Sequence, residues 1–233
     1  MSRTFLSAFS LALATMALPA AAQVHSDDVR MGVSGGKLTV SGAPHTNLQG
    51  LSIFEGDLGD LAGGLFSTDD PGFDSAPGTF GSGVRVNYQA HGPLHFWNGS
   101  AWSSAAVPSA VTLRLEGNLG ETTIFASNGI SGDASGLIGV AGTSGQIHEH
   151  LDWTVLGGNR TAVGAYYVSL SLAANGFASS DPFYVVLNRG LDEAAFETSV
   201  QALAAVPEPS VWALSLLGLA AVGWRAKRAA AQQ

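Results

Sequence analysis

The feature that most constrains the fold is a succession of short apolar runs separated by turns rich in glycine, asparagine and serine. In several runs apolar and polar residues alternate: Val111, Leu113 and Leu115 would point to one side of a strand, and the residues between them to the other. About ten such runs, with turn signals every eight to twelve residues or so, predict an antiparallel sandwich or barrel. The runs cover residues 29–33, 37–41, 51–54, 84–89, 94–97, 111–116, 122–126, 137–141, 147–156, 165–173 and 183–187.

We therefore expect an all-β protein, an antiparallel β-sandwich of jelly-roll or immunoglobulin-like type, with one helix near its C-terminal end. The helix is predicted over residues 192–203, where two acidic residues stand at the start and suit the helix dipole. Residues 55–83 are rich in Gly, Asp, Pro and Ser and predict a long loop or several turns. The apolar face of the helix would consist of Ala195, Phe196, Val200 and Leu203.

The two ends of the chain differ in pattern from the part between them. Arg3, an apolar stretch over residues 5–18 and small residues at 19–22 are typical of a secretory signal peptide with a new N-terminus at Gln23. At the other end, Pro207-Glu208-Pro209 precedes an uncharged run over residues 211–224 and a basic cluster over 225–228. As a helix this run would be roughly 21 Å long, with a tryptophan at each end, as at a membrane interface.

This tail resembles the PEP-CTERM sorting signal of Gram-negative bacteria in the order of its motif, apolar helix and basic end. The resemblance implies an exosortase that cuts near Pro207–Pro209, a signal peptidase at the other end, and a mature protein retained at the cell surface or released. An ordinary C-terminal anchor or a buried helix is the alternative. We expect a signal peptide (1–22), an exported sandwich domain (23–190), a helix and linker (191–205), a sorting signal (206–228) with a transmembrane helix (211–224), and a cytoplasmic tail (229–233), hence an inner-membrane intermediate before release.

Composition excludes several classes of function. Four of the 10 basic residues and only one of the 18 acidic residues lie in the end segments, so the exported part has a net charge near −11. Such a surface argues against nucleic-acid binding. The chain has no cysteine, which excludes disulfides and thiolate metal ligands. No nucleophile motif of the Gly-x-Ser-x-Gly type is present, and we expect no enzyme.

The sharpest chemical motif is His148-Glu149-His150-Leu151-Asp152. On a strand, His148, His150 and Asp152 would share one face, and Ile147, Leu151 and Trp153 would lie on the other, facing the core. Both imidazoles could then reach one metal ion, with Asp152 as a ligand or an orienting group. Imidazole suits zinc, copper, nickel or iron. Two exposed histidines on a polar strand face are the alternative.

The other four histidines of the chain and one acidic stretch offer further candidates. His25 would be third in the mature chain, where it could form a copper or nickel site with the free amine or complete the site of His148 and His150. His91 and His95 flank Gly92-Pro93, which forbids a helix and predicts a turn. Six acidic residues within twenty could hold calcium, although solvated turn carboxylates are the simpler interpretation: Glu55, Asp57, Asp60, Asp69, Asp70 and Asp74.

Gly142 and His148-x-His150 resemble the opening of the first cupin motif, which would imply a metal-dependent enzyme. The glutamate of that motif is missing, because Thr154 and Val155 stand at the expected positions, and the second motif has no match.

Six segments carry a broader resemblance, which covers about residues 25–195; they are residues 25–29, 70–74, 94–99, 145–151, 164–170 and 180–190. In these segments the chain is similar to a family of exported PEP-CTERM proteins repressed by the zinc-uptake regulator Zur, and it departs from that family at Asn98 and Arg189. The resemblance implies a role when zinc is scarce, in scavenging, storing or passing on zinc outside the cytoplasm. From the residues themselves we expect the zinc to bind through His148 and His150, with His25 as a third ligand. The alternatives are a structural or adhesive component of the extracellular matrix, in contact with exopolysaccharide and without a metal role, and a cupin-type enzyme.

Overall fold

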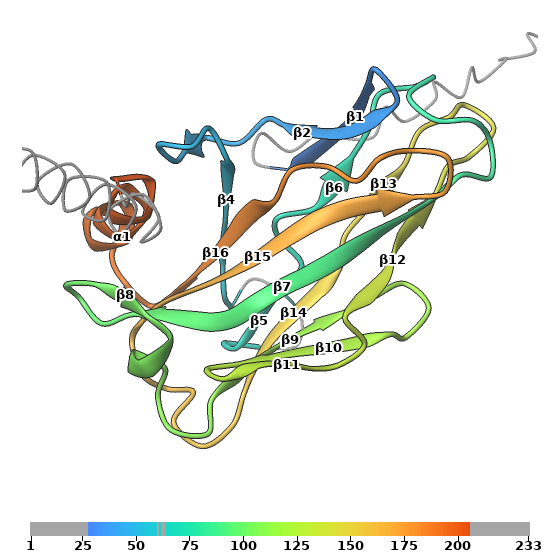
Figure 1. Cartoon of the computed structure of the whole chain (residues 1–233). Helices are drawn as coiled ribbons and strands as arrows, with labels where there is room; N and C mark the ends of the chain where they lie inside the picture. Colours follow the sequence, from blue (N-terminus) through green and yellow to red (C-terminus); the bar gives the residue numbers. More distant parts are fainter. Residues whose placement is uncertain (1–27, 60, 62–63, 206–233) are drawn as a thin grey trace, which may run out of the picture.

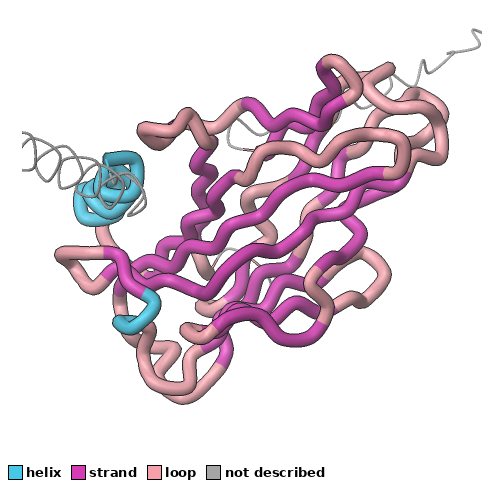
Figure 2. The backbone as a smooth tube through the Cα atoms, in the orientation of Figure 1, coloured by secondary structure: helices cyan, strands magenta, loops and turns pink. Residues whose placement is uncertain are grey.

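The computed structural model describes residues 28–59, 61 and 64–205. It is mostly β-structure, in three sheets that share one core, with a single C-terminal helix among the described residues (Figures 1 and 2). Sequence analysis therefore predicted the all-β class and the helix correctly. The predicted signal peptide, His25, the Pro-Glu-Pro motif and the predicted transmembrane run lie outside the described residues.

The largest sheet has seven strands and contains the long central strands of Figure 1. Its order is β12 (Ser135–Val140), β7 (Arg85–Trp97), β15 (Gly164–Ala174), β16 (Phe183–Arg189), β4 (Ser52–Asp57) and β3 (His45–Thr46), with β8 (Trp102–Ser103) paired to β7. A short 3-10 helix (Ser104–Ala106) follows β8. The β16–β4 pairing is parallel, so the expectation of a purely antiparallel fold is wrong at this place. Parallel neighbours need a long crossover, and these two strands are far apart in the sequence.

Two smaller sheets complete the fold. The five-stranded sheet has the order β11 (Gly129–Gly132), β10 (Thr122–Ala126), β9 (Thr112–Glu116), β14 (Asp152–Leu156) and β5 (Ser67–Thr68). The four-stranded sheet has the order β13 (His148–Glu149), β6 (Phe73–Asp74), β1 (Val29–Ser34) and β2 (Lys37–Ser41). Here β1 and β6 are also parallel. In the view of Figure 1 the β1–β2 hairpin and strands β9–β11 lie on opposite sides of β7 and β15.

Local sequence explains the turn between β1 and β2 and the burial pattern of β9. Between β1 and β2, Gly35 and Gly36 have positive φ angles of 57° and 79°, the conformation that a two-residue turn of type I′ requires. In β9, Leu113 and Leu115 are fully buried while their neighbours are partly exposed, as the alternation predicted.

The main core draws apolar side chains from all three sheets, among them Leu38, Leu115 and Leu170. Burial of this kind of surface is the principal stabilising contribution in folding. A second, smaller cluster lies on the other face of the seven-stranded sheet, where Ala165 and Val186 alternate with the core residues of their strands.

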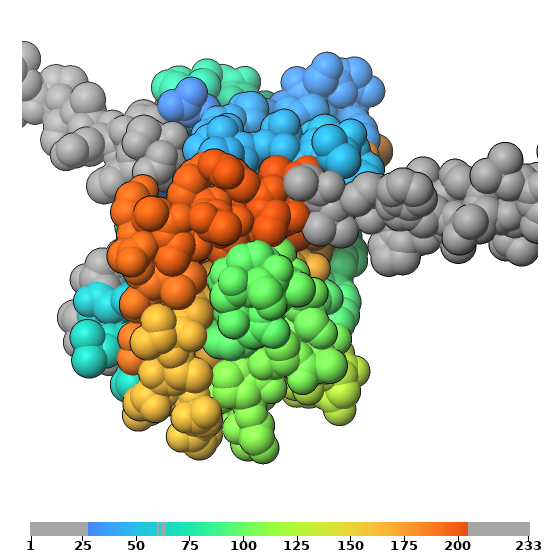
Figure 3. Space-filling model, turned by 90° about the vertical axis from the view of Figure 1, so that its left-hand side faces the viewer, coloured from blue at the N-terminus to red at the C-terminus, as the bar shows by residue number. Residues whose placement is uncertain are grey.

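Helix α1 (Glu193–Ala205) covers that second cluster. Its N-terminus is capped by Asp192, whose carboxylate accepts a hydrogen bond of 2.8 Å from the Ala195 amide. Phe196, Val200 and Leu203 are buried, as the sequence predicted for the apolar face. Figure 3 shows the helix, in orange, lying across one end of the molecule between the N-terminal strands above and residues near 100 below. Within the part of the chain that the structure describes, no helix has the length and apolar character needed to cross a membrane.

Candidate functional site

Three segments far apart in the sequence meet where β1, β6 and β13 pair. Asp28 directly precedes β1, residues 69–74 lead into and form β6, and His148 begins β13. The pairings place Val29 beside Phe73, and His148 beside Asp74. We call the resulting group of side chains the histidine–aspartate cluster; its members are Asp28, Asp70, Asp74, His148 and His150.

The first part of the cluster contains Asp28, Asp70 and His150, each of which offers one ligand atom within 4.8 Å of the others. Asp28 is only 2% exposed. One of its oxygens, Oδ1, accepts a hydrogen bond of 3.0 Å from the Gly72 amide. Its other oxygen, Oδ2, is buried and has no hydrogen-bond partner among the described residues. His150 Nδ1 lies 3.5 Å from Asp70 Oδ1.

Hydrogen bonding assigns the tautomer of His150. Its Nδ1 lies 3.0 Å from the backbone carbonyl oxygen of Asp69, which can only accept, so Nδ1 donates. The lone pair of the neutral ring then belongs to Nε2. Metal-binding histidines generally have this arrangement, in which a carbonyl or carboxylate orients the ring through its second nitrogen.

Gly72 permits this close packing. A Cβ atom at position 72 would lie 2.7 Å from His150 Nε2 and 2.8 Å from Asp28 Oδ1. Contacts that short would force His150 or Asp28 to move, so the observed approach of the imidazole and the carboxylate to the backbone depends on the absence of a side chain at this position.

The second part of the cluster is the pair formed by Asp74 and His148. Asp74 Oδ1 and His148 Nδ1 are 3.6 Å apart, and both atoms are buried without a hydrogen-bond partner among the described residues. Two ligands of one tetrahedral zinc ion, each about 2.0–2.2 Å from the metal, are about 3.3–3.6 Å apart. The rings of His148 and His150 are 5.4 Å apart between centroids, so the two parts adjoin.

Of the predicted ligands that the structure describes, the two histidines lie together and Asp152 lies apart from them. His148 and His150 lie side by side, and Ile147, Leu151 and Trp153 are buried on the opposite side, as the alternation predicted. Asp152, however, begins β14 in a different sheet, is exposed, and pairs in register with Glu116. Together with His150 it lines a polar surface hollow.

Two groups that were considered separately come together here. Asp69, Asp70 and Asp74 of the acidic stretch lie beside the histidines, whereas Glu55 and Asp57 belong to β4, and Asp60 is outside the described residues. Asp28 was not predicted as a site residue, because a single acidic residue before a strand gives no signal in the sequence.

His91 and His95 are occupied by other contacts. His91 Nε2 is 2.8 Å from the Ser171 hydroxyl, and the His95 ring stacks on Tyr167 with 4.3 Å between centroids. Burial lowers the pKa of His95 below its usual value. The predicted turn at these residues is wrong: β7 continues through them, with an irregularity in its pairing to β15 that accommodates the Gly92-Pro93 pair.

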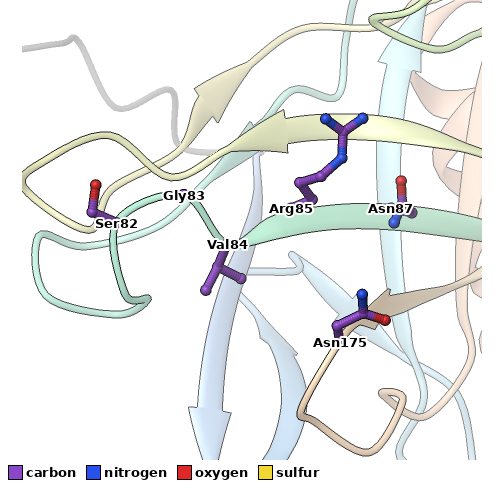
Figure 4. Close-up of a pocket in the computed structure, with 6 residues that line it drawn as sticks. All are labelled: Ser82, Gly83, Val84, Arg85, Asn87 and Asn175. Atoms are coloured by element: carbon purple, nitrogen blue, oxygen red, sulfur yellow. The ribbon is translucent and has the colours of Figure 1, made fainter.

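A second mixed group lies under helix α1. His45, Glu55 and Glu197, from β3, β4 and α1, place one ligand atom each within 4.8 Å of one another. A hollow at the start of β7 is different in character (Figure 4). It contains no carboxylate or histidine; its lining consists of Ser82, Gly83, Val84, Arg85, Asn87 and Asn175.

Comparison with known proteins identifies only the tail. No curated protein and no solved structure matches the chain. Residues 205–228 match the family model of the PEP-CTERM protein-sorting motif, as the resemblance of Pro207-Glu208-Pro209 and the run after it had indicated. This sorting motif implies processing by an exosortase and a location at the cell surface or outside the cell.

Proposed function

We propose that this exported protein binds a divalent metal ion, zinc in the first place, at the histidine–aspartate cluster. The observation that carries the proposal is a set of buried donor atoms that have no hydrogen-bond partner among the described residues: Asp28 Oδ2, Asp74 Oδ1 and His148 Nδ1. A buried polar group without a partner costs about 1–3 kcal/mol, and a buried charge costs more. A bound cation would coordinate these donor atoms and so offset the cost of burying them.

The donor chemistry supports zinc over calcium or magnesium. The cluster offers two imidazoles and three carboxylates, whereas calcium and magnesium prefer oxygen donors alone. Neutral imidazole nitrogen at Nε2 of His150 and carboxylate oxygen from Asp28 and Asp70 form a set of the kind that zinc accepts. The Asp74–His148 pair, at 3.6 Å, has the spacing of two zinc ligands.

The sorting motif and the resemblance to the Zur-repressed family support the biological side of the proposal. A protein carried to the cell surface and made when zinc is scarce would capture zinc outside the cytoplasm. The signal peptide, a role for His25 and the inner-membrane intermediate remain parts of this proposal.

A structural matrix component, associated with exopolysaccharide, is the alternative. In that case the Asp74–His148 pair would be an ion pair with a protonated histidine, and the cluster would contribute to folding alone.

Zinc titration by calorimetry tests the proposal on the full-length protein in detergent, beside the double variant His148→Ala/His150→Ala. We expect one equivalent of zinc to bind at the histidine–aspartate cluster, and the double variant to lose that equivalent. His91→Ala is the matched control, since His91 contacts only Ser171 among the partners described above. Equal binding in wild type and double variant would exclude this site, and absence of binding in both would favour the matrix protein.

A further inference from the structure

Helix α1 is joined to the seven-stranded sheet by a polar group as well as by its apolar face. His45 lies on β3, Glu55 on the neighbouring strand β4, and Glu197 on the helix. The strands pair His45 with Ile53, which brings His45 close to Glu55 two residues further along. Glu197 follows the buried Phe196 and so lies at the edge of the helix–sheet contact.

The geometry of this group is that of metal donors. His45 Nε2 is 3.4 Å from Glu55 Oε1 and 3.6 Å from Glu197 Oε2. Both distances fall in the range of about 3.3–3.6 Å expected between two ligands of a tetrahedral zinc ion. The side chains are 22–37% exposed, so the group is open to an ion from solvent while its members are held by the surrounding elements.

The supporting contacts favour a cation. The other oxygen of Glu197, Oε1, accepts a hydrogen bond of 2.8 Å from Gln201, which orients the carboxylate and leaves Oε2 toward His45. Among the described residues no lysine or arginine forms an ion pair with Glu197. The His45 imidazole therefore lies close to two carboxylates, and no lysine or arginine among the described residues neutralises the charge of Glu197.

We propose that His45, Glu55 and Glu197 form a second divalent-cation site, which fastens helix α1 to the edge of the sheet. Two hydrogen bonds to backbone carbonyls of the helix already hold it: the Trp102 indole Nε1 donates to the Ser199 carbonyl, and the Leu48 amide donates to the Ala204 carbonyl. The ion would add a third attachment that depends on metal supply. Because the sorting motif begins at residue 205, where the helix ends, the attachment governs how firmly the chain is held immediately before that motif.

A protonated His45 between two carboxylates is the competing arrangement, and metal dependence separates the two. The measurement is hydrogen exchange of the α1 amides in the full-length protein, with and without zinc. His148→Ala/His150→Ala serves as the background, so that zinc at the histidine–aspartate cluster does not contribute. We expect zinc at 100 times its dissociation constant to slow exchange in α1 by up to about 100-fold.

Substitution at the site itself supplies the decisive comparison. Both His45→Ala and Glu197→Gln should abolish the effect of zinc on α1, and the glutamine keeps the size of the side chain. Glu193→Gln, on the exposed first turn of the same helix, should retain it. Exchange in α1 that ignores zinc, or a zinc effect that survives both substitutions, would overturn the second site. The difference in zinc binding between wild type and His148→Ala/His150→Ala does not depend on His45 or Glu197, so the two proposals fail separately.

Discussion

Gly72 is the single residue on which the packing of the histidine–aspartate cluster most directly depends. In Gly72→Ala the new methyl group would lie 2.6–2.8 Å from atoms of His150 and Asp28, so one or both side chains must move. We expect zinc affinity to fall about 10–100-fold, as for other changes that misplace a ligand, and stability to fall by roughly 1–3 kcal/mol. Calorimetry and chemical denaturation measure the two effects.

Gly158→Ala is the control, since a Cβ atom there meets nothing within 4 Å and its backbone is outside the left-handed region. Equal zinc binding by the two alanine variants would show that the space around Gly72 has no part in binding the ion.

A substitution at Asp28 should change stability without zinc and stabilisation by zinc in different ways. In Asp28→Asn the remaining carbonyl oxygen can still accept from the Gly72 amide, while the buried charge disappears. Without zinc we expect unchanged or higher stability, because burying an unpaired charge is costly. With zinc at 100 times the wild-type dissociation constant, wild type should gain about 2.7 kcal/mol and the variant much less.

Thermal unfolding with and without zinc measures this difference. Asp181→Asn removes a carboxylate from a surface pair with Lys37 and should respond to zinc like wild type. A variant Asp28→Asn that keeps the full zinc effect would remove Asp28 from the ligand set.

Among the elements, the segment over residues 147–156 shows what sequence can and cannot provide. The alternation correctly predicted which side chains are buried, because that depends only on the direction of successive residues. It could not show that the segment is divided between β13 and β14, in two different sheets. That division separates Asp152 from the histidines and brings in Asp74 through the β13–β6 pairing, a contact between distant segments that no local spacing reveals.

Helix α1, by contrast, was predictable from the sequence, because its capping residue, its apolar face and its boundaries depend only on residues close together in the chain. Phe196→Ala should lower the free energy of unfolding by about 3–5 kcal/mol, because the ring is buried in the second apolar cluster. Thr198→Ala, on the exposed side of the same helix, should change it by less than about 0.5 kcal/mol. Urea denaturation of both variants tests this; similar losses would mean that the helix is not packed through Phe196.

For the molecule as a whole, stability should decline in alkali because a buried tyrosine resists ionisation in the folded state. Burial raises the pKa of Tyr166 to about 12 from 10 in the unfolded chain. The contribution of this group is therefore complete below pH 10 and is lost as pH rises from 10 to 12, because only the unfolded chain releases the proton. The lowered pKa of His95 has its effect in acid. Stability falls as pH drops below about 6.5, because the unfolded chain takes up the proton more readily than the folded protein.

Tyr166→Phe isolates the alkaline part of this profile. The Tyr166 hydroxyl is buried with no hydrogen-bond partner among the described residues, so its removal should leave stability at pH 7 unchanged or higher. The decline between pH 10 and 12 should become shallower. Denaturation midpoints across this range measure it, and an unaltered decline would mean that other tyrosines carry the effect.

The parallel pairing of β4 with β16 has a consequence for the order of folding. It joins Ile53 to Tyr184, so the largest sheet contains a contact between the first third of the chain and its last quarter. Contacts of such separation slow folding, since a long loop must close before they form. A chain that emerges N-terminus first cannot complete this sheet until β16 has appeared, a few residues before the helix that leads into the sorting motif. The largest sheet can therefore be completed only shortly before the sorting signal appears, or after it.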